Sequence, residues 1–253
     1  MWPADVAVDR FELTLELSDA NGNVTTAQQI VRPQLYEPRT PLRLPSDAAL
    51  FVHAGHDLLA HHRRFPLHSA LTERLGIAHN VTRYAYDFAV IDERGEMYRG
   101  DGTKRSDWYG FGTPVLAPAA GVVVETFNDQ PDNDIGQPPR LEAKALVENP
   151  KRLFGNYILI DHGNGEFGLL AHLKQGSVEV RPGQRVTAGQ KLGAIGMSGD
   201  ASIVHLHFQM QSGRGFDEGV PSRFVEWRRR TGEGWASAQL NAPESGDVIR
   251  RAN

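Results

Sequence analysis

The stretch ASIVHLHFQM, residues 201–210, is the part of the sequence around which the rest can be organised. Its β-branched and aromatic residues favour a β-strand. Because successive side chains of a strand point to opposite faces, His205 and His207 would share one face, and Leu206 and Phe208 the other. Two imidazoles on a rigid element suit a metal ion and one adjacent catalytic group, since zinc accepts neutral imidazole nitrogen. On its own, the pair is more typical of a solvent-facing strand edge than of a site.

The composition excludes several classes of protein. With 253 residues, the chain is long enough for one large domain or for a main domain with a small one. A formal net charge of -4 gives no general basic surface for nucleic acid or anionic lipid. The absence of cysteine excludes thiol catalysis, disulfides and cysteine zinc ligands. We expect no export signal or membrane anchor in the chain as written, because neither a basic-then-apolar leader nor a long apolar run is present.

The N-terminal region has the pattern of a β-hairpin. Residues 10–17 alternate apolar with polar side chains, residues 19–23 favour a turn, and residues 24–31 favour a second strand. The proline-rich segment 32–45 that follows is incompatible with regular helix or central strand. We therefore predict that residues 1–45 form a small β-rich unit with its linker.

The remaining chain is predicted to be mainly β. Residues 46–215 contain short strands at intervals of roughly 8–12 residues, including a hairpin over 156–173, which is typical of a sandwich or barrel. Residues 128–155 are polar and proline-rich, so we expect a surface insertion. Residues 216–253 are expected to pack on this domain as a C-terminal extension, with 221–230 as a short helix.

Asp87 is a carboxylate in the middle of an apolar strand, TRYAYDFAV. Burying it without a partner would be costly, so a cationic or metal partner is expected. One alternative is a salt bridge to an arginine such as Arg83 or Arg105; the other is a metal ion.

Candidate chemistry falls in four places: the histidine-rich segment 53–68, Asp87, His172 in LLAHL, and the pair His205 and His207. A histidine and aspartate set without cysteine is what a hydrolytic zinc site needs. Two imidazoles and one carboxylate bind the metal, and a water with a lowered pKa takes the open position. The other histidines can then carry protons or stabilise an oxyanion.

Five motifs in order carry a family resemblance: RYAYDFAV, FGTPVLAPAAGVVV, GNYILIDHGNGEFGLLAHL, VRPGQRVTAGQKLGAIGMSGDAS and HLHFQM. Together, over about residues 50–212, they resemble the lysostaphin-like (LytM-type) zinc endopeptidases. The resemblance implies a mainly β fold with the duplicated hybrid motif, and cleavage of peptide cross-bridges in bacterial peptidoglycan. It also implies a location in the cell envelope, periplasmic or secreted, and we expect a monomer with one zinc ion per chain.

The resemblance also implies roles for individual residues. Asp87 matches the metal carboxylate of the family, and His207, second in His-x-His, matches a metal histidine. His205 and His172 match the two non-ligand histidines that position water and stabilise the tetrahedral intermediate. No member of this set is lost, so the chain does not resemble the catalytically inactive scaffolds of the family.

The first metal histidine departs from the family pattern. Arg83 occupies its position in the short His-x-x-x-Asp form, and arginine does not ligate zinc because it keeps its proton. The segment GHDLLAHH resembles the His-His element of a longer-looped branch of the family, which favours His62 as the ligand. His61 and His79 are the alternatives, and His79 would need a sharp bend to reach Asp87.

The mechanism expected from this resemblance uses zinc held by His62, Asp87 and His207 to lower the pKa of a water molecule. Either His172 or His205 then receives the proton and orients attack on a peptide carbonyl. Two other functions fit the same sequence. One is a non-catalytic scaffold that binds peptidoglycan or regulates, and the other is a histidine phosphocarrier with the same hybrid motif. About one zinc per chain would favour the peptidase over the phosphocarrier.

Overall fold

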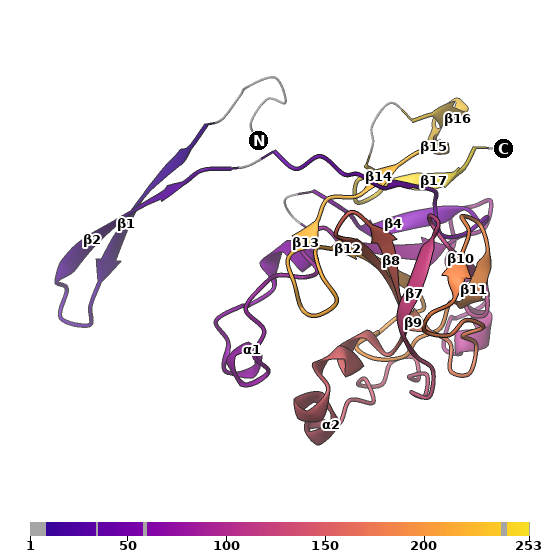
Figure 1. Ribbon diagram of the computed structural model, residues 1–253, viewed down its shortest axis with the longest axis horizontal. Helices are drawn as coiled ribbons and strands as arrows, with labels where there is room; N and C mark the ends of the chain where they lie inside the picture. The colour runs from indigo at the N-terminus through magenta and orange to yellow at the C-terminus, as the bar shows by residue number, and fades with distance from the viewer. Residues whose placement is uncertain (1–8, 34, 58–59, 239–241, 253) are drawn as a thin grey trace. The chain divides into compact units, whose positions relative to one another are not determined.

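The computed structural model describes residues 9–33, 35–57, 60–238 and 242–252. The chain divides into two compact units, Met1–Glu37 and Pro38–Asn253. The first unit contains one antiparallel hairpin of β1 (Phe11–Ser18) and β2 (Val24–Val31), with the predicted strands in register from Phe11 opposite Val31 (Figure 1). In its turn, the Asp19 carboxylate accepts hydrogen bonds from two backbone N–H groups. This unit ends at residue 37, whereas the sequence places the boundary at 45.

The second unit is mainly β, which confirms the predicted fold class. Its strands are β3 (Pro41–Leu42), β4 (Leu50–Ala54), β5 (Tyr86–Val90), β6 (Pro114–Leu116), β7 (Gly121–Phe127), β8 (Asn156–Gly163), β9 (Glu166–Leu173), β10 (Arg185–Val186), β11 (Lys191–Ala194), β12 (Leu206–Gln211), β13 (Gly219–Val220), β14 (Arg223–Phe224), β15 (Trp227–Thr231), β16 (Gly234–Ser237) and β17 (Val248–Arg251). Its helices are α1 (Ala70–Arg74) and α2 (Ala143–Glu148), with the 3-10 turns η1 (His61–Arg64), η2 (Arg105–Asp107) and η3 (Pro150–Phe154). None of the helices described has the length and apolar character needed to cross a membrane.

An 11-stranded sheet in the order β10-β7-β8-β9-β12-β5-β4-β17-β15-β16 organises this unit, with β13 paired to β12. The central strands β8, β9 and β12 follow one another as neighbours (Figure 1). Two small sheets, β11-β6 and β14-β3, complete the fold. In the part of the chain that the structure describes, β10 and β16 do not pair, so the sheet is open and no barrel closes.

Strand register brings the two central polar side chains together. β12 lies between β9 and β5, and His207 is opposite Asp87. The intervening residues of both strands point to the other face, where Phe208 is opposite Tyr86 and the Tyr86 and Phe88 rings stack with centroids 5.1 Å apart. An apolar core on one face therefore anchors the strands that present Asp87 and His207 on the other.

A second buried cluster flanks these polar residues; it consists of Val81, Phe154, Tyr157, Leu159, Leu169 and Ala171. Phe154 comes from η3, within the segment 128–155 that the sequence indicates as a surface insertion. This segment also forms α2, and its Phe154 side chain is buried. Part of the segment therefore belongs to the core beside the polar site.

The predicted helix over residues 221–230 is wrong. This segment forms β14 and β15, and β15 pairs with both β17 and β16. Glu226 has a φ of 55°, in the left-handed region, which interrupts any right-handed helix between the two strands. Three strands of the C-terminal segment thus extend the main sheet beyond β4.

Candidate metal centre

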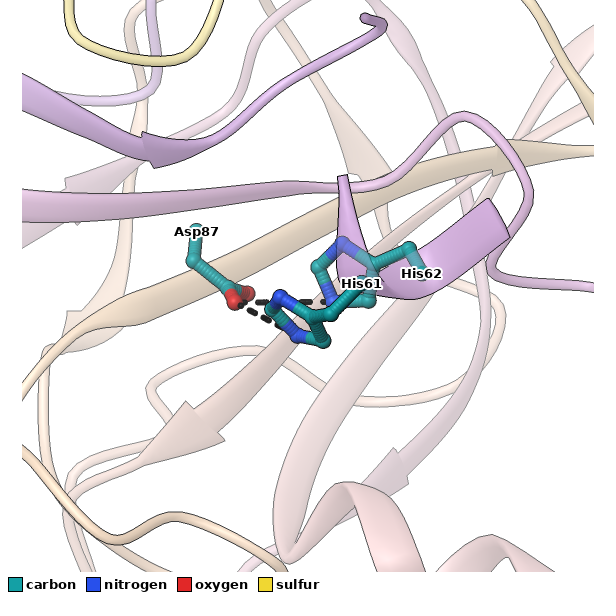
Figure 2. A group of neighbouring side chains, drawn as sticks. All are labelled: His61, His62 and Asp87. Atoms are coloured by element: carbon teal, nitrogen blue, oxygen red, sulfur yellow. Dashed lines mark ion pairs between the residues drawn. The ribbon is translucent and has the colours of Figure 1, made fainter. Parts of the chain in front are cut away.

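Asp87 is the focus of the site, because four histidine rings approach its buried carboxylate. On one side, the Nε2 atoms of His61 and His62 lie 3.4 and 3.5 Å from Asp87 Oδ2 (Figure 2). On the other, His205 Nε2 and His207 Nδ1 lie 3.4 and 3.1 Å from Oδ1. Asp87 therefore lies between the histidines of η1 and those at the start of β12.

The alternative of an arginine partner for Asp87 is wrong. Arg83 forms its ion pair with Glu218, and Arg105 pairs with Asp134 across 3.0 Å. Among the residues that the structure describes, the ion pairs of Asp87 are with histidine alone. A carboxylate surrounded by imidazoles rather than guanidinium is typical of a metal site.

Two of the three candidates for the first metal histidine reach Asp87. One ligand atom each from His61, His62 and Asp87 lies within 4.8 Å of the others, and Figure 2 shows both rings extending from one turn towards the carboxylate. His79 is elsewhere, with its Nδ1 atom 3.8 Å from Glu218 Oε2. The two candidates differ in exposure, since the His62 side chain is 9% exposed and that of His61 is 56% exposed.

Hydrogen bonds between η1 and neighbouring segments hold the turn in place. The carbonyl of His62 accepts a hydrogen bond of 2.9 Å from Asn80 Nδ2 and a longer one of 3.5 Å from Thr82 Oγ1. The Arg63 guanidinium donates two hydrogen bonds to the carbonyl of His56, at 3.1 and 2.6 Å. Asn80 is buried, so its anchor to the turn is shielded from water.

His172 and His205 are each oriented by a backbone carbonyl. His172 Nδ1 lies 2.8 Å from the oxygen of Ser198, and His205 Nδ1 lies 3.0 Å from that of Ile203. A carbonyl only accepts hydrogen bonds, so Nδ1 carries the proton in both rings and Nε2 is the proton-accepting atom of the neutral form. The two ring centroids are 4.8 Å apart. His172 has a φ of 59°, an uncommon conformation of the kind found at functional sites.

The Ser198 carbonyl is itself fixed by a buried network. Ser198 Oγ accepts from the Asn156 N–H at 2.9 Å and donates to the Leu173 carbonyl at 2.7 Å. Gly155 and Gly199 have φ values of 65° and 73°, and a Cβ on either would overlap the backbone of the other segment. Glycine at both positions allows the two segments to lie in contact and to place the carbonyl that orients His172.

Burial and mutual charge set the protonation states. Burial raises the pKa of Asp87, but the charge of His205 and the hydrogen bonds from His205 and His207 outweigh burial and hold this pKa well below its usual value. Burial lowers the pKa of His205, but the nearby Asp87 carboxylate reverses the effect and raises it. Burial lowers the pKa of His62 to about 3 and that of His172 well below its usual range. An ionised carboxylate and neutral imidazoles are the forms that bind zinc.

All these groups line one cavity of about 350 Å³. Its apolar wall consists of Phe65, Val81, Leu153, Phe154, Ile203 and Phe216, and its other lining residues are His53, His61, His62, Thr82, Asp87, His172, Asp200, Ser202, His205 and His207. A concave, mainly apolar cavity with a few converging polar groups is the usual form of a substrate site. The donor set of imidazole nitrogen and carboxylate oxygen fits zinc. It contains no lysine or arginine whose fixed positive charge would balance the charge of Asp87.

Several side chains that shape the site are not predicted from the sequence. Asn80 and Ser198 act on backbone carbonyls, and nothing in their local sequence indicates this. Gln209 is different, because it follows His205 and His207 at the same period of two, and its Oε1 lies 2.9 Å from His207 Nε2. Extending the alternation by one step along the strand would have identified it.

Part of this domain is similar to known proteins. Residues 107–218 match the model of Peptidase family M23. The chain is 31% identical over 99 residues to the peptidoglycan DD-endopeptidase ShyA of Vibrio cholerae, and 31% identical over 100 residues to the cell division protein DipM of Caulobacter vibrioides. A solved structure, the deep-sea M23 metalloprotease pseudoalterin, has 14% identity and a TM-score of 0.40, covering 83% of this chain and 95% of that one. The predicted resemblance is confirmed for residues 107–218, which are similar to peptidase family M23.

The extent of these matches is informative. The alignments with ShyA and DipM cover 39% and 40% of this chain but only 17% and 13% of those proteins. The family match contains His172, His205 and His207 but begins after Asp87 and η1. The remaining candidate ligands therefore come from the preceding part of the chain, and the fold brings them to the matched part.

Proposed function

We propose that this chain is a zinc-dependent endopeptidase that hydrolyses peptide cross-bridges of bacterial peptidoglycan. The observation that carries the proposal is the meeting of Asp87 with His207 across paired strands, in a cavity that also contains His62, His172 and His205. A stabilising ion pair alone needs one cation, whereas this carboxylate has four imidazoles around it. The M23 family match supports the peptidase class.

In this proposal His62, Asp87 and His207 hold the metal, with His61 as the alternative to His62. Zinc bound there would supply a Lewis acid that acidifies a water molecule and polarises a peptide carbonyl. His62 is favoured over His61 because its ring is buried and neutral, and because Asn80 anchors its backbone. An exposed ring such as His61 loses more side-chain entropy when it is fixed by a ligand.

His172 and His205 perform the proton chemistry. His172 is neutral, with Nδ1–H donated to the Ser198 carbonyl, so Nε2 is available to accept the proton of the attacking water. The same atom then returns the proton to the departing amine nitrogen. His205 has a raised pKa, and in its charged form its Nε2–H can stabilise the oxyanion of the tetrahedral intermediate.

The substrate assignment has a separate basis. One relative, 31% identical over 99 residues, is named a peptidoglycan DD-endopeptidase. Peptide stems and cross-bridges present carbonyls on a flexible chain that can enter a cavity walled by Phe65, Phe154 and Phe216. We place the protein accordingly in the cell envelope, in the periplasm or outside the cell.

Digestion of purified sacculi by the metal-replete protein tests this function. We expect release of new amino groups and loss of cross-linked muropeptides, both abolished by a chelator and restored by zinc. Neither His205→Ala nor His207→Ala should cleave, whereas His79→Ala, which changes a histidine paired with Glu218 instead, should cleave normally. Zinc-loaded protein that leaves sacculi and short cross-linked peptides intact would contradict the proposal and support a non-catalytic scaffold.

A further inference from the structure

A line of buried polar side chains extends from the candidate metal centre along β12. His207, Gln209 and Gln211 share one face of the strand, and the two glutamines are 0% and 1% exposed. His207 Nε2 lies 2.9 Å from Gln209 Oε1, and Gln209 Nε2 donates to Gln211 Oε1 at 2.7 Å. Buried amides are costly unless they are hydrogen-bonded, so this line is a connected network.

The far end of the network determines its direction. Gln211 Nε2 donates to the carbonyls of Gly213 and Gly215, at 2.7 and 2.9 Å. Because carbonyls only accept, the amide nitrogen of Gln211 must face them, and its oxygen must face Gln209. The amide nitrogen of Gln209 must then face Gln211, which directs its oxygen at His207. An oxygen at that place accepts a hydrogen bond, so His207 Nε2 must carry a proton.

We propose that Gln209 and Gln211 are positioning residues that hold His207 in its Nε2–H tautomer. The other ring nitrogen, Nδ1, is 3.1 Å from Asp87 Oδ1 and donates to that carboxylate in the metal-free protein, so it is the nitrogen whose proton a bound metal would replace. His172 and His205 have the opposite tautomer, because backbone carbonyls bind their Nδ1–H groups. The ring that offers Nδ1 to the centre is therefore fixed by the two glutamines.

The network also connects the metal centre to the wall of the cavity. The loop that accepts from Gln211 contains Phe216, which lines the cavity, and the Asp217 carboxylate accepts from the Gly215 N–H at 2.8 Å. Partners of this kind, which hydrogen-bond a metal ligand from behind, typically change metal affinity about 10- to 100-fold. The use of the network in zinc binding rests on the proposed function, but the tautomer itself does not.

Nitrogen-15 NMR of the histidine rings in the full-length, metal-free chain tests the tautomer. At about pH 8, where an ordinary histidine is neutral, we expect His207 to show a protonated Nε2, because Gln209 Oε1 accepts from it. In Gln209→Leu, which removes this acceptor, Nε2 should lose its proton, while Nδ1 keeps the proton that Asp87 accepts. Zinc affinity, measured by chelator competition, should fall about 10- to 100-fold.

Gln209→Glu and Gln211→Leu separate the two steps of the network. The first keeps an oxygen facing His207 and should retain the proton on Nε2. The second removes the oxygen that accepts from Gln209 Nε2, so the Gln209 amide is no longer directed and the Nε2 proton should be lost in part. An unprotonated Nε2 in the unaltered protein, or an unchanged Nε2 proton and zinc affinity in Gln209→Leu, would overturn the proposal.

The two proposals fail separately. If the tautomer responds as expected but sacculi are not cleaved, the positioning role stands and the endopeptidase function fails. If sacculi are cleaved and the tautomer of Gln209→Leu does not change, the endopeptidase stands and the positioning role fails. The unaltered protein needs no substitution for the first measurement, so misfolding of a variant leaves the tautomer testable.

Discussion

The two halves of the metal centre are built in different ways. Asp87 and His207 lie opposite each other on β5 and β12, so the register of a central sheet sets their separation. His61 and His62 lie on η1, a four-residue 3-10 turn without a side-chain N-cap hydrogen bond. The turn depends on a few contacts, chiefly the hydrogen bond from Asn80 to His62. In the proposed centre, the sheet would therefore fix where the metal binds, and the turn would determine which histidine completes the ligand set.

The largest effects are expected in the sheet half. Asp87→Ala and His207→Ala each remove a ligand and leave the other ligands in place. We expect zinc affinity to fall by more than about 100-fold, the upper end for partners that only support a ligand. Chelator competition measures this, with circular dichroism to confirm folding. Retention of zinc affinity in either variant would show that the sheet does not contain the centre.

Substitutions in the turn half separate its two histidines. His62→Ala should reduce zinc affinity by more than about 100-fold, whereas the exposed His61 should be replaceable by alanine with a loss below about 10-fold. His79→Ala is the control and should leave affinity unchanged, because its ring pairs with Glu218. The reverse order of His61→Ala and His62→Ala would assign the ligand to His61.

The same contrast explains what the sequence could predict. The mainly β fold, the hairpin over 156–173 and the common face of His205 and His207 follow from an alternation of period two that strands preserve. The position of η1 has no such period, because a turn reaches its partner through tertiary contacts at a distance along the chain. For this reason the sequence favours His62 as the first metal histidine but leaves His61 and His79 as alternatives. The structure excludes His79, because its ring pairs with Glu218 instead of Asp87.

The C-terminal segment was misassigned for a related reason. The arginines and aromatic residues of 221–230 are compatible with either a helix or an edge strand, and pairing of β15 with β17 decides between them. Those two strands are separated along the chain, so the local pattern contains no signal for the pairing. Tertiary context overrides local preference at this point.

The anchor of the turn gives an intermediate effect. Asn80→Ala leaves the His62 carbonyl without its shorter partner, and we expect about a 10-fold loss of zinc affinity and about 1–3 kcal/mol of stability. Asn128→Ala is a suitable control, because Asn128 accepts from the Val178 N–H away from the centre. The control should lose stability and keep its zinc affinity. Equal zinc affinity in the two variants would show that Asn80 does not support the metal centre.

The smallest effect is a pH dependence of the metal-free protein. Burial lowers the pKa of His56 to about 4 and that of His62 to about 3, from 6.5 in the unfolded chain. Between pH 6.5 and about 4 the unfolded chain therefore holds more protons, and the free energy of unfolding falls as the pH falls. Each histidine contributes a slope of up to about 1.4 kcal/mol per pH unit. Urea unfolding across this range measures the slope, which His56→Leu should reduce; an equal slope would contradict the assignment.

A crystal structure of the zinc-loaded protein, with anomalous data collected at the zinc absorption edge, tests the proposed centre directly. We predict one strong peak per chain, bound by Asp87, by His207 through Nδ1 and by His62, inside the cavity that also contains His172 and His205. A peak at any other place, or its absence from zinc-saturated crystals, would contradict the assignment of this centre.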